Sequence, residues 1–191
     1  MKKKGSARFV FRTSMPWEWA SMIRIRPATP CDAPALPGIE RSSGAIFRHW
    51  AGLEWIADDD VQSEEQHRAL IADGVAFVAE LAGHGPTAFL NGAVMPDALH
   101  IWQVAVHQDR QGRGLGRQLI DAAQRHAVDH GLPCLTLTTF RTVPWNEPYY
   151  QRLGFVTLDD RQLGPRLQAV LDAERRAGLP IAQRCAMRKT L

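Results

Sequence analysis

The stretch Val104-Ala-Val-His-Gln-Asp-Arg-Gln-Gly-Arg-Gly-Leu-Gly-Arg-Gln-Leu-Ile120 carries most of the information about the fold. It predicts an apolar strand that runs through a glycine-rich loop directly into an amphipathic helix. Glycines at 112, 114 and 116 permit backbone conformations closed to residues with a Cβ, so consecutive N–H groups can face one ligand. The positive end of the following helix adds to this attraction. The stretch therefore predicts a binding site for phosphate groups.

The spacing of the glycines excludes two common kinds of phosphate site. The dinucleotide fingerprint G-x-G-x-x-G is absent, and the next expected strand, Cys134 to Thr139, ends without the acidic residue that would bind a ribose. A P-loop needs Gly-Lys-Ser/Thr at the start of the helix, whereas Gly116 is followed by Arg117 and Gln118. The loop therefore belongs to neither of these two kinds of phosphate site.

That loop, Gln111-Gly-Arg-Gly-Leu-Gly116, resembles the Q/R-x-x-G-x-G/A signature of the GNAT superfamily of acyl-CoA-dependent N-acyltransferases. A second segment, Asn146-Glu-Pro-Tyr-Tyr-Gln-Arg-Leu-Gly-Phe155, resembles the asparagine, tyrosine and Leu-Gly-Phe ending of the same family. The resemblance extends from about Met22 to the C-terminus. The chain departs from the family in one respect, because Asn146 lies only four residues before Tyr150 and members commonly place it further upstream.

Length and composition bound the domain organisation. The 191 residues, 45% of them hydrophobic, suffice for one substantial core and are too few for two domains of ordinary size. We expect residues 1–21 to be a disordered N-terminal extension, or to arise from an upstream start codon. Residues 22–191 are expected to form one GNAT-like acetyltransferase domain.

The formal net charge of +3 comes from the N-terminal segment. The first 21 positions hold five basic residues and one acidic residue: Lys2, Lys3, Lys4, Arg8, Arg12 and Glu18. The rest of the chain is nearly neutral and lacks the basic face that duplex binding requires. We therefore expect no nucleic-acid partner.

Apolar runs and cysteines indicate the compartment. No segment approaches the roughly 18 apolar residues of a membrane span, and Arg8 and Arg12 interrupt the run that a signal peptide needs. Cys31, Cys134 and Cys185 are widely spaced without a C-x-x-C pair, which favours reduced, buried thiols over disulfides or zinc. We expect a cytoplasmic protein with no membrane partner and no metal.

Periodicity and turn residues predict a mixed sheet. Strands are expected at 22–26, 74–81, 87–95, 99–106, 135–139, 155–158 and 184–188. Helices are expected at about 33–40, 61–72, 115–130, 148–152 and 165–177. The run Asp58-Asp-Asp60 is expected to cap the second helix. The expected fold class is α/β (α+β mixed): a GNAT-like, mostly antiparallel mixed sheet, splayed at its central strands, with helices on both faces.

The resemblance implies how acetyl-CoA would bind as co-substrate. In GNAT-like proteins the strand before the glycine loop splays from its neighbour, and the pantetheine arm inserts there as a further strand. The residues that match the pantetheine contacts are Val104, Ala105 and Val106. Those that match the pyrophosphate contacts are Gln111, Gly112, Arg113, Gly114, Leu115, Gly116 and Arg117, and Asn146 matches a further cofactor contact. A tight strand-to-helix turn with ordinary core valines is the alternative.

Acyl transfer to an amine needs two proton events, because the ammonium must lose a proton and the departing thiolate must gain one. Tyr150 matches the general-acid tyrosine of the family, although Tyr149 could point there while Tyr150 packs. His100 matches the strand position of the glutamate base in histone-acetylating members, and a neutral imidazole can accept a proton. A structural histidine is the alternative. Glu40 and His49, near the helices that usually wall the acceptor site, are competing bases and candidate substrate contacts.

Trp145 is a candidate wall of the acceptor site, because it lies in the loop before Tyr150; core packing is the alternative. The resemblance implies an N-acetyltransferase in which the amine attacks acetyl-CoA directly within a ternary complex. An acyl-CoA-binding sensor or scaffold with the same fold is the alternative. The acceptor is expected to be a small-molecule or peptide amine that no local motif identifies, and similar proteins commonly form homodimers.

Overall fold

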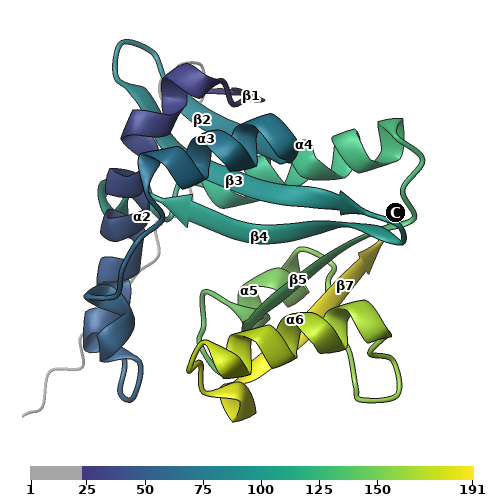
Figure 1. Ribbon diagram of the computed structural model, residues 1–191. Coiled ribbons are helices and arrows are strands. Elements are labelled where there is room, and N and C mark those ends of the chain that lie inside the picture. The colour runs from purple at the N-terminus through teal and green to yellow at the C-terminus, as the bar shows by residue number, and fades with distance from the viewer. Residues whose placement is uncertain (1–22) are drawn as a thin grey trace, which may run out of the picture.

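A computed structural model describes residues 23–191, which form a seven-stranded sheet of order β1-β2-β3-β4-β5-β7-β6 (Figure 1). β4 and β5 run parallel, and the other neighbouring strands are antiparallel. The strands are β1 (Ile23–Pro27), β2 (Val75–Leu81), β3 (Gly85–Met95), β4 (Ala98–Val106), β5 (Cys134–Phe140), β6 (Val156–Thr157) and β7 (Arg184–Thr190). The expected mixed, mostly antiparallel sheet is confirmed.

Helices cover both faces of the sheet. On one face lie α2 (Leu36–Gly44), α3 (Glu64–Asp73) and α6 (Pro165–Arg176). On the other lie α4 (Leu115–Asp129) and α5 (Glu147–Arg152). Short 3-10 helices cover Pro30–Ala35, Ala45–His49, Glu54–Ala57, Gln108–Arg110 and Ile181–Gln183. The arm formed by residues 45–57 extends from α2 alongside the second half of the sheet (Figure 1).

Most expected elements agree with the structure within one or two residues, and the differences have local causes. The helix expected at 61–72 begins at Glu64, so the expected capping by Asp58-Asp-Asp60 is wrong. Ser63 Oγ accepts from Gln66 N at 3.2 Å, and Gln66 Oε1 accepts from Ser63 N at 2.6 Å. This capping box satisfies the first N–H groups of α3 and leaves the acidic run outside the helix.

The first helix and one cysteine also differ from expectation. The helix expected at 33–40 is a 3-10 helix up to Ala35 followed by α2, since Pro34 and Pro37 interrupt regular α-helical bonding. Of the three thiols expected to be buried, Cys31 is exposed. The expectation for residues 1–21 lies outside the described residues.

The core joins the sheet to α4. Leu119, Ile120, Ala123 and Ala127 are buried at helical spacing, as expected. They pack with inward-facing side chains of β2 to β5 and β7 in one continuous apolar cluster. This cluster spans both halves of the sheet, so α4 fixes the strand that precedes the glycine loop.

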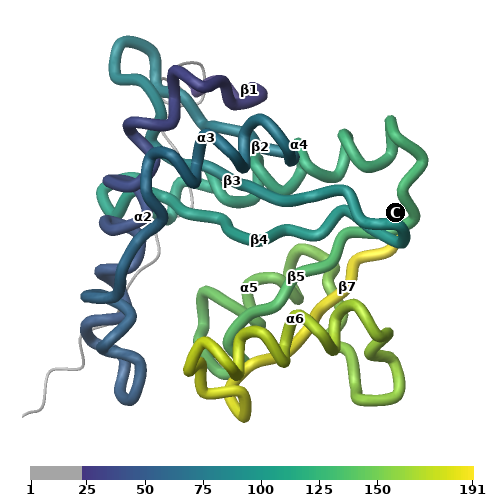
Figure 2. The backbone as a smooth tube through the Cα atoms, viewed as in Figure 1, coloured from purple at the N-terminus to yellow at the C-terminus, as the bar shows by residue number. Residues whose placement is uncertain are grey.

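The parallel pair β4 and β5 separates after three residues. Its register joins Leu99 to Leu135, His100 to Thr136 and Ile101 to Leu137, and then stops. Beyond that point β4 remains paired with β3, whereas β5 remains paired with β7. The two strands diverge in Figure 2, which leaves one edge of β4 without a strand partner. This is the splay that the resemblance implied.

A β-bulge lies in β4 at the point of divergence. Ile101 pairs with Gly92 and Gln103 pairs with Asn91, so Trp102 has no partner on β3. The extra residue turns Gln103 and Ala105 toward α2. Gly92 permits the close approach of the strands, since a Cβ there would lie 2.5 Å from the His100 carbonyl oxygen.

We predict that Gly92→Ala destabilises the fold by about 1–3 kcal/mol, because the added methyl group must displace backbone and not a mobile side chain. Urea denaturation measures the change. Gly38→Ala is the matched control, since a Cβ at that position would have no other atom within 4 Å. In helix α2 it should be neutral or stabilise by about 0.5–1 kcal/mol. Equal effects of the two substitutions would contradict the prediction.

Candidate active site

The glycine loop adopts the geometry of an anion site. Gly112 and Gly114 have φ angles of 70° and 78°, in the left-handed region that favours glycine, and Gly114 is the N-cap of α4. The first N–H groups of an α-helix have no partner within the helix, and its N-terminus carries partial positive charge. The loop therefore presents donors and positive potential together.

The expected loop residues take different positions. Gln111 Nε2 donates to Val106 O at 3.1 Å, which ties the start of the loop to β4. Arg117 is exposed and its Nε lies 3.7 Å from Asp121 Oδ2, on the outer side of α4. Leu115 is buried in the core cluster. The contacts expected from these residues to a phosphate stay predictions.

The unpaired edge of β4 is formed by alternate residues. Val106 N donates to Ser43 Oγ at 3.4 Å, and its oxygen accepts from Gln111, so both groups face away from β3. Alternation along a strand places the backbone groups of Val104 on the same edge. Ala105, between them, bonds toward β3 and packs its side chain under α2. Of the three expected strand residues, Val104 and Val106 present backbone groups to the open side.

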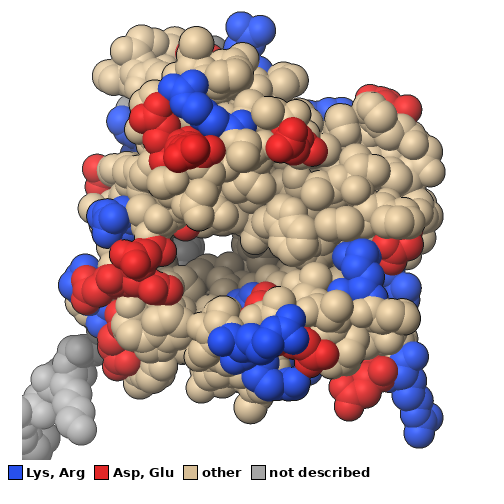
Figure 3. Space-filling view, in the orientation of Figure 1, with Lys and Arg blue, Asp and Glu red and all other residues tan. Residues whose placement is uncertain are grey.

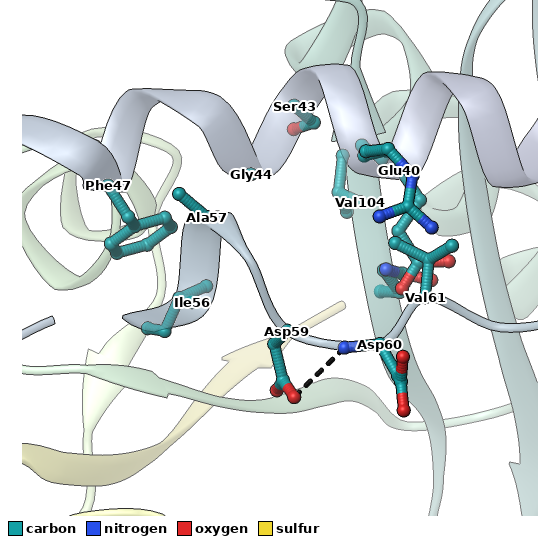
Figure 4. A pocket seen from close by; sticks show the side chains of 13 residues that line it. Glu40, Ser43, Gly44, Phe47, Ile56, Ala57, Asp59, Asp60, Val61 and Val104 are labelled. Carbon is teal, nitrogen blue, oxygen red and sulfur yellow. Dashed lines mark hydrogen bonds between the residues drawn. The ribbon is translucent and has the colours of Figure 1, made fainter. Parts of the chain in front are cut away.

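A cavity of about 220 Å³ opens beside this edge. Its walls come from α2, the segment 56–61 and β4, as Figure 4 shows. Figure 3 shows the molecule hollowed between the two halves of the sheet, with acidic side chains at one rim. The carboxylates among the lining residues are Glu40, Asp59 and Asp60, and Arg41 lies with them. The cavity is acidic on balance, and it adjoins the backbone of Val104.

Glu40 is the expected substrate residue that the structure brings to this cavity. Its Oε2 accepts from Gln62 N at 3.2 Å and lies 3.3 Å from His67 Nε2. His67 was missed at the level of sequence, and Asp59 and Asp60 were assigned to a helix cap. The Ser63-x-x-Gln66 pattern is the signal in the sequence for a helix that begins at residue 64. It would have shown that Asp59 and Asp60 lie before the helix and do not cap it.

Of the two tyrosines of α5, Tyr149 lies beside the glycine loop and Tyr150 follows it in sequence, packed on the ring of Tyr149. A Cβ on Gly116 would lie 2.9 Å from Tyr149 Oη and 3.9 Å from Val104 Cγ1, so the Tyr149 hydroxyl lies over the first turn of α4. The ring of Tyr150 lies 5.3 Å from that of Tyr149 and packs against Phe155. Burial raises the pKa of Tyr149 to about 12 and also raises the pKa of Tyr150 above its ordinary value. Both phenols are protonated at neutral pH, the state that a proton donor needs.

His100 lies at the closed end of the splay and is fully buried. Its Nδ1 lies 2.9 Å from Thr136 Oγ1 and 3.4 Å from Nη1 of Arg166, which in turn pairs with Asp97 at 2.7 Å. Burial, and then the charge of Arg166, lower the pKa of His100 to about 4. The imidazole does not line the cavity. Its role as base stays a prediction.

The remaining candidates differ in position. Trp145 packs edge-on against Phe47 and Trp50, with ring centroids 5.6 and 5.1 Å away. Phe47 also lines the cavity, so Trp145 supports its wall from behind. His49 is exposed and does not line the cavity. Asn146 is the N-cap residue of α5, where its backbone oxygen accepts from Tyr150 N.

Two features are absent from residues 23–191. In that part of the chain no three His, Cys, Asp or Glu side chains are grouped so as to hold a metal ion. Within the same range, no helix has the length and apolar character needed to cross a bilayer.

Known families and curated proteins include sequences similar to this chain. The model of the acetyltransferase (GNAT) family matches residues 45–155. A segment of 61 residues is 44% identical to L-2,4-diaminobutyric acid acetyltransferase of Streptomyces coelicolor. The alignment covers 29% of this chain and only 36% of the length of the curated relative.

Solved structures share the fold. The PaiA N-acetyltransferase of Thermoplasma acidophilum, in complex with coenzyme A, superposes with a TM-score of 0.66 at 16% identity, over 88% of this chain and 99% of that one. The ribosomal-protein-S18-alanine N-acetyltransferase of Escherichia coli gives 0.62 at 18% identity, over 88% and 94%. At such identities the likeness concerns the fold alone.

The buried His100 predicts a pH dependence of stability. Its pKa is about 4 in the folded protein against 6.5 for an unperturbed histidine, so only the unfolded chain binds this proton between those values. Stability therefore falls as pH decreases from 6.5 to 4, by about 3 kcal/mol from this group. His100→Asn should remove that part of the slope in urea titrations at several pH values. His84→Asn, in an exposed turn, is the control, and an unchanged slope in His100→Asn would refute the assignment.

Proposed function

Because the chain belongs to the acetyltransferase (GNAT) family, we propose that it transfers the acetyl group of acetyl-CoA to the primary amine of a small acceptor. The observation that carries the proposal is the unpaired edge of β4, which connects the glycine loop at one end with the acidic cavity beside Val104. A donor held along that edge would present its thioester to an amine in the cavity. The amine attacks directly, and no residue of the protein is acylated.

The residues present fit coenzyme A. The pantetheine arm carries amide groups that can bond to the backbone of Val104 as an added strand would. The pyrophosphate matches the left-handed glycines and the N-terminus of α4. When bound, acetyl-CoA supplies an activated acyl thioester. The protein contributes the position of that thioester relative to the amine, and backbone N–H groups that stabilise developing negative charge on the carbonyl oxygen.

Tyr150 is the proposed general acid. Protonation of the departing thiolate requires a donor that is protonated at neutral pH, and the raised pKa of the Tyr150 phenol meets this requirement. Tyr149 meets it too, and its hydroxyl lies over the first turn of α4. The assignment to Tyr150 therefore rests on the position that it shares with the tyrosine of the family.

The proposed acceptor is a small amine with more than one positive charge. Glu40, Asp59 and Asp60 outnumber Arg41 in the cavity, and its volume of about 220 Å³ suits a short chain. The partial likeness to L-2,4-diaminobutyric acid acetyltransferase favours the same class. A peptide amine is the competing acceptor, since the cavity opens toward the hollow between the half-sheets (Figure 3).

An acceptor panel tests the proposed function. Thiol release from acetyl-CoA is measured with L-2,4-diaminobutyrate, putrescine, L-lysine, ethylamine and a short peptide with a free N-terminal alanine. We expect kcat/KM to be at least about tenfold higher for the acceptors with two ammonium groups than for ethylamine, because each carboxylate contact adds about 1 kcal/mol or more. Acetyl-CoA binding by calorimetry without thiol release from any amine would instead favour the sensor or scaffold.

Two matched tyrosine variants test the general acid. Tyr150→Phe should lower kcat by about 10²-fold or more while leaving the dissociation constant of acetyl-CoA nearly intact, since only proton donation is lost. Tyr149→Phe is the comparison, with an expected loss of less than about tenfold. Initial rates and calorimetry measure the two quantities. Unchanged turnover in Tyr150→Phe, with a large loss in Tyr149→Phe, would transfer the role to Tyr149.

A further inference from the structure

A partly exposed carboxylate and a buried imidazole meet between α2 and α3. Glu40 belongs to α2 and His67 to α3, and their side chains are 16% and 1% exposed. His67 Nε2 lies 3.3 Å from Glu40 Oε2 and has no hydrogen-bond partner of good geometry among the described residues. The imidazole packs edge-on against Phe89, with ring centroids 5.1 Å apart. The apolar core therefore holds the imidazole, while the carboxylate lies between the imidazole and the cavity.

The carboxylate of Glu40 reaches the cavity beside the open edge of β4. Its contacts to His67 and to Gln62 N are both made by Oε2. Oε1 makes no hydrogen bond to the described residues, and Glu40 lines the cavity together with Val104 (Figure 4). An amine that approached a thioester on the Val104 edge would thus meet this carboxylate.

Other carboxylates and imidazoles are placed less well for proton transfer. Asp59 and Asp60 line the same cavity but are exposed, so water competes for their charge. His100 faces Thr136 and Arg166 at the closed end of the splay. The charged groups that surround Glu40 are His67 of α3, Asp59 and Asp60 before α3, and Arg41 on its own helix.

We propose that Glu40 is a catalytic residue that removes a proton from the acceptor ammonium, and that the buried His67 positions it. This proposal rests on the proposed function. The ammonium gives one proton to the Glu40 carboxylate, and the resulting amine forms the N–C bond as the C–S bond breaks. Of the two protons that the nitrogen loses in total, one reaches the thiolate and the other is released to solvent through Glu40.

The test uses Glu40→Gln, which preserves size and removes the proton acceptor. With the best acceptor of the panel, kcat/KM for the amine at pH 7 should fall by about 10²-fold or more, while the KM for acetyl-CoA stays within about twofold. The deficit should shrink by nearly tenfold per pH unit as the pH rises toward the pKa of the amine, because free amine then no longer needs the carboxylate. Glu65→Gln, an exposed carboxylate on α3, is the control and should match the wild type.

The pH profile separates catalysis from structure. A purely structural role for Glu40 predicts a deficit of constant size at every pH, and that result, or wild-type activity in Glu40→Gln, would overturn the proposal. If Glu40→Gln does not fold, Glu40→Asp keeps the carboxylate and should retain the wild-type pH profile at lower kcat. Loss of the proposed function is a separate outcome, since wild-type protein would then release no thiol with any amine.

His67 has its own prediction as a positioning residue. His67→Gln should lower kcat less than Glu40→Gln does and should preserve the shape of the wild-type pH profile, because the carboxylate remains. In the double variant the loss should equal that of Glu40→Gln alone, since His67 acts only through Glu40. Additive losses would show that His67 does not act through the carboxylate.

Discussion

The early end of hydrogen bonding between β4 and β5 is the constraint on which the rest of the structure depends. Buried backbone N–H and C=O groups are nearly always paired, so a strand that loses its neighbour must find partners elsewhere. Val106 finds them in Ser43 and Gln111, at the point where the strand enters the glycine loop. Val104 faces the cavity. A ligand that brings its own amide groups completes the pairing. The open edge is therefore suited to bind the acetyl donor.

Contacts at both ends keep the two half-sheets apart and in register. At the closed end, Arg166 of α6 joins Asp97, which precedes β4, to Thr136 of β5, the residue that pairs with His100. At the open end, Phe47 of the arm packs against Phe140, the last residue of β5, and against Trp145 in the following loop, with ring centroids 5.9 and 5.6 Å away. Polar contacts therefore link the half-sheets at one end, and aromatic packing links them at the other.

Much of this fold could be predicted from local sequence, and the elements that could not be predicted have identifiable causes. The glycine loop, the hairpin and α4 could be predicted because turn chemistry and periodicity act over a few residues. The bulge at Trp102 could not, because it depends on how closely β3 approaches at Gly92. The start of α3 was misplaced since two capping signals compete within six residues, and the Ser63 box satisfies more backbone groups than the acidic run does.

In the candidate site, some residues could be predicted from sequence motifs and others depend on tertiary contacts. The donor side could be read from contiguous motifs, which lie within the matched residues 45–155. Glu40 lies before that range, and its partner His67 is brought to it by the packing of α2 against α3. By resemblance, His100 occupies the strand position of a base, yet its neighbours here are a guanidinium, a hydroxyl and the indole ring of Trp102. A position in a strand can be transferred from one family member to another, but the basicity of the side chain depends on what surrounds it. The residues of the acceptor site are therefore brought together by tertiary contacts between distant segments, and no contiguous sequence motif includes them.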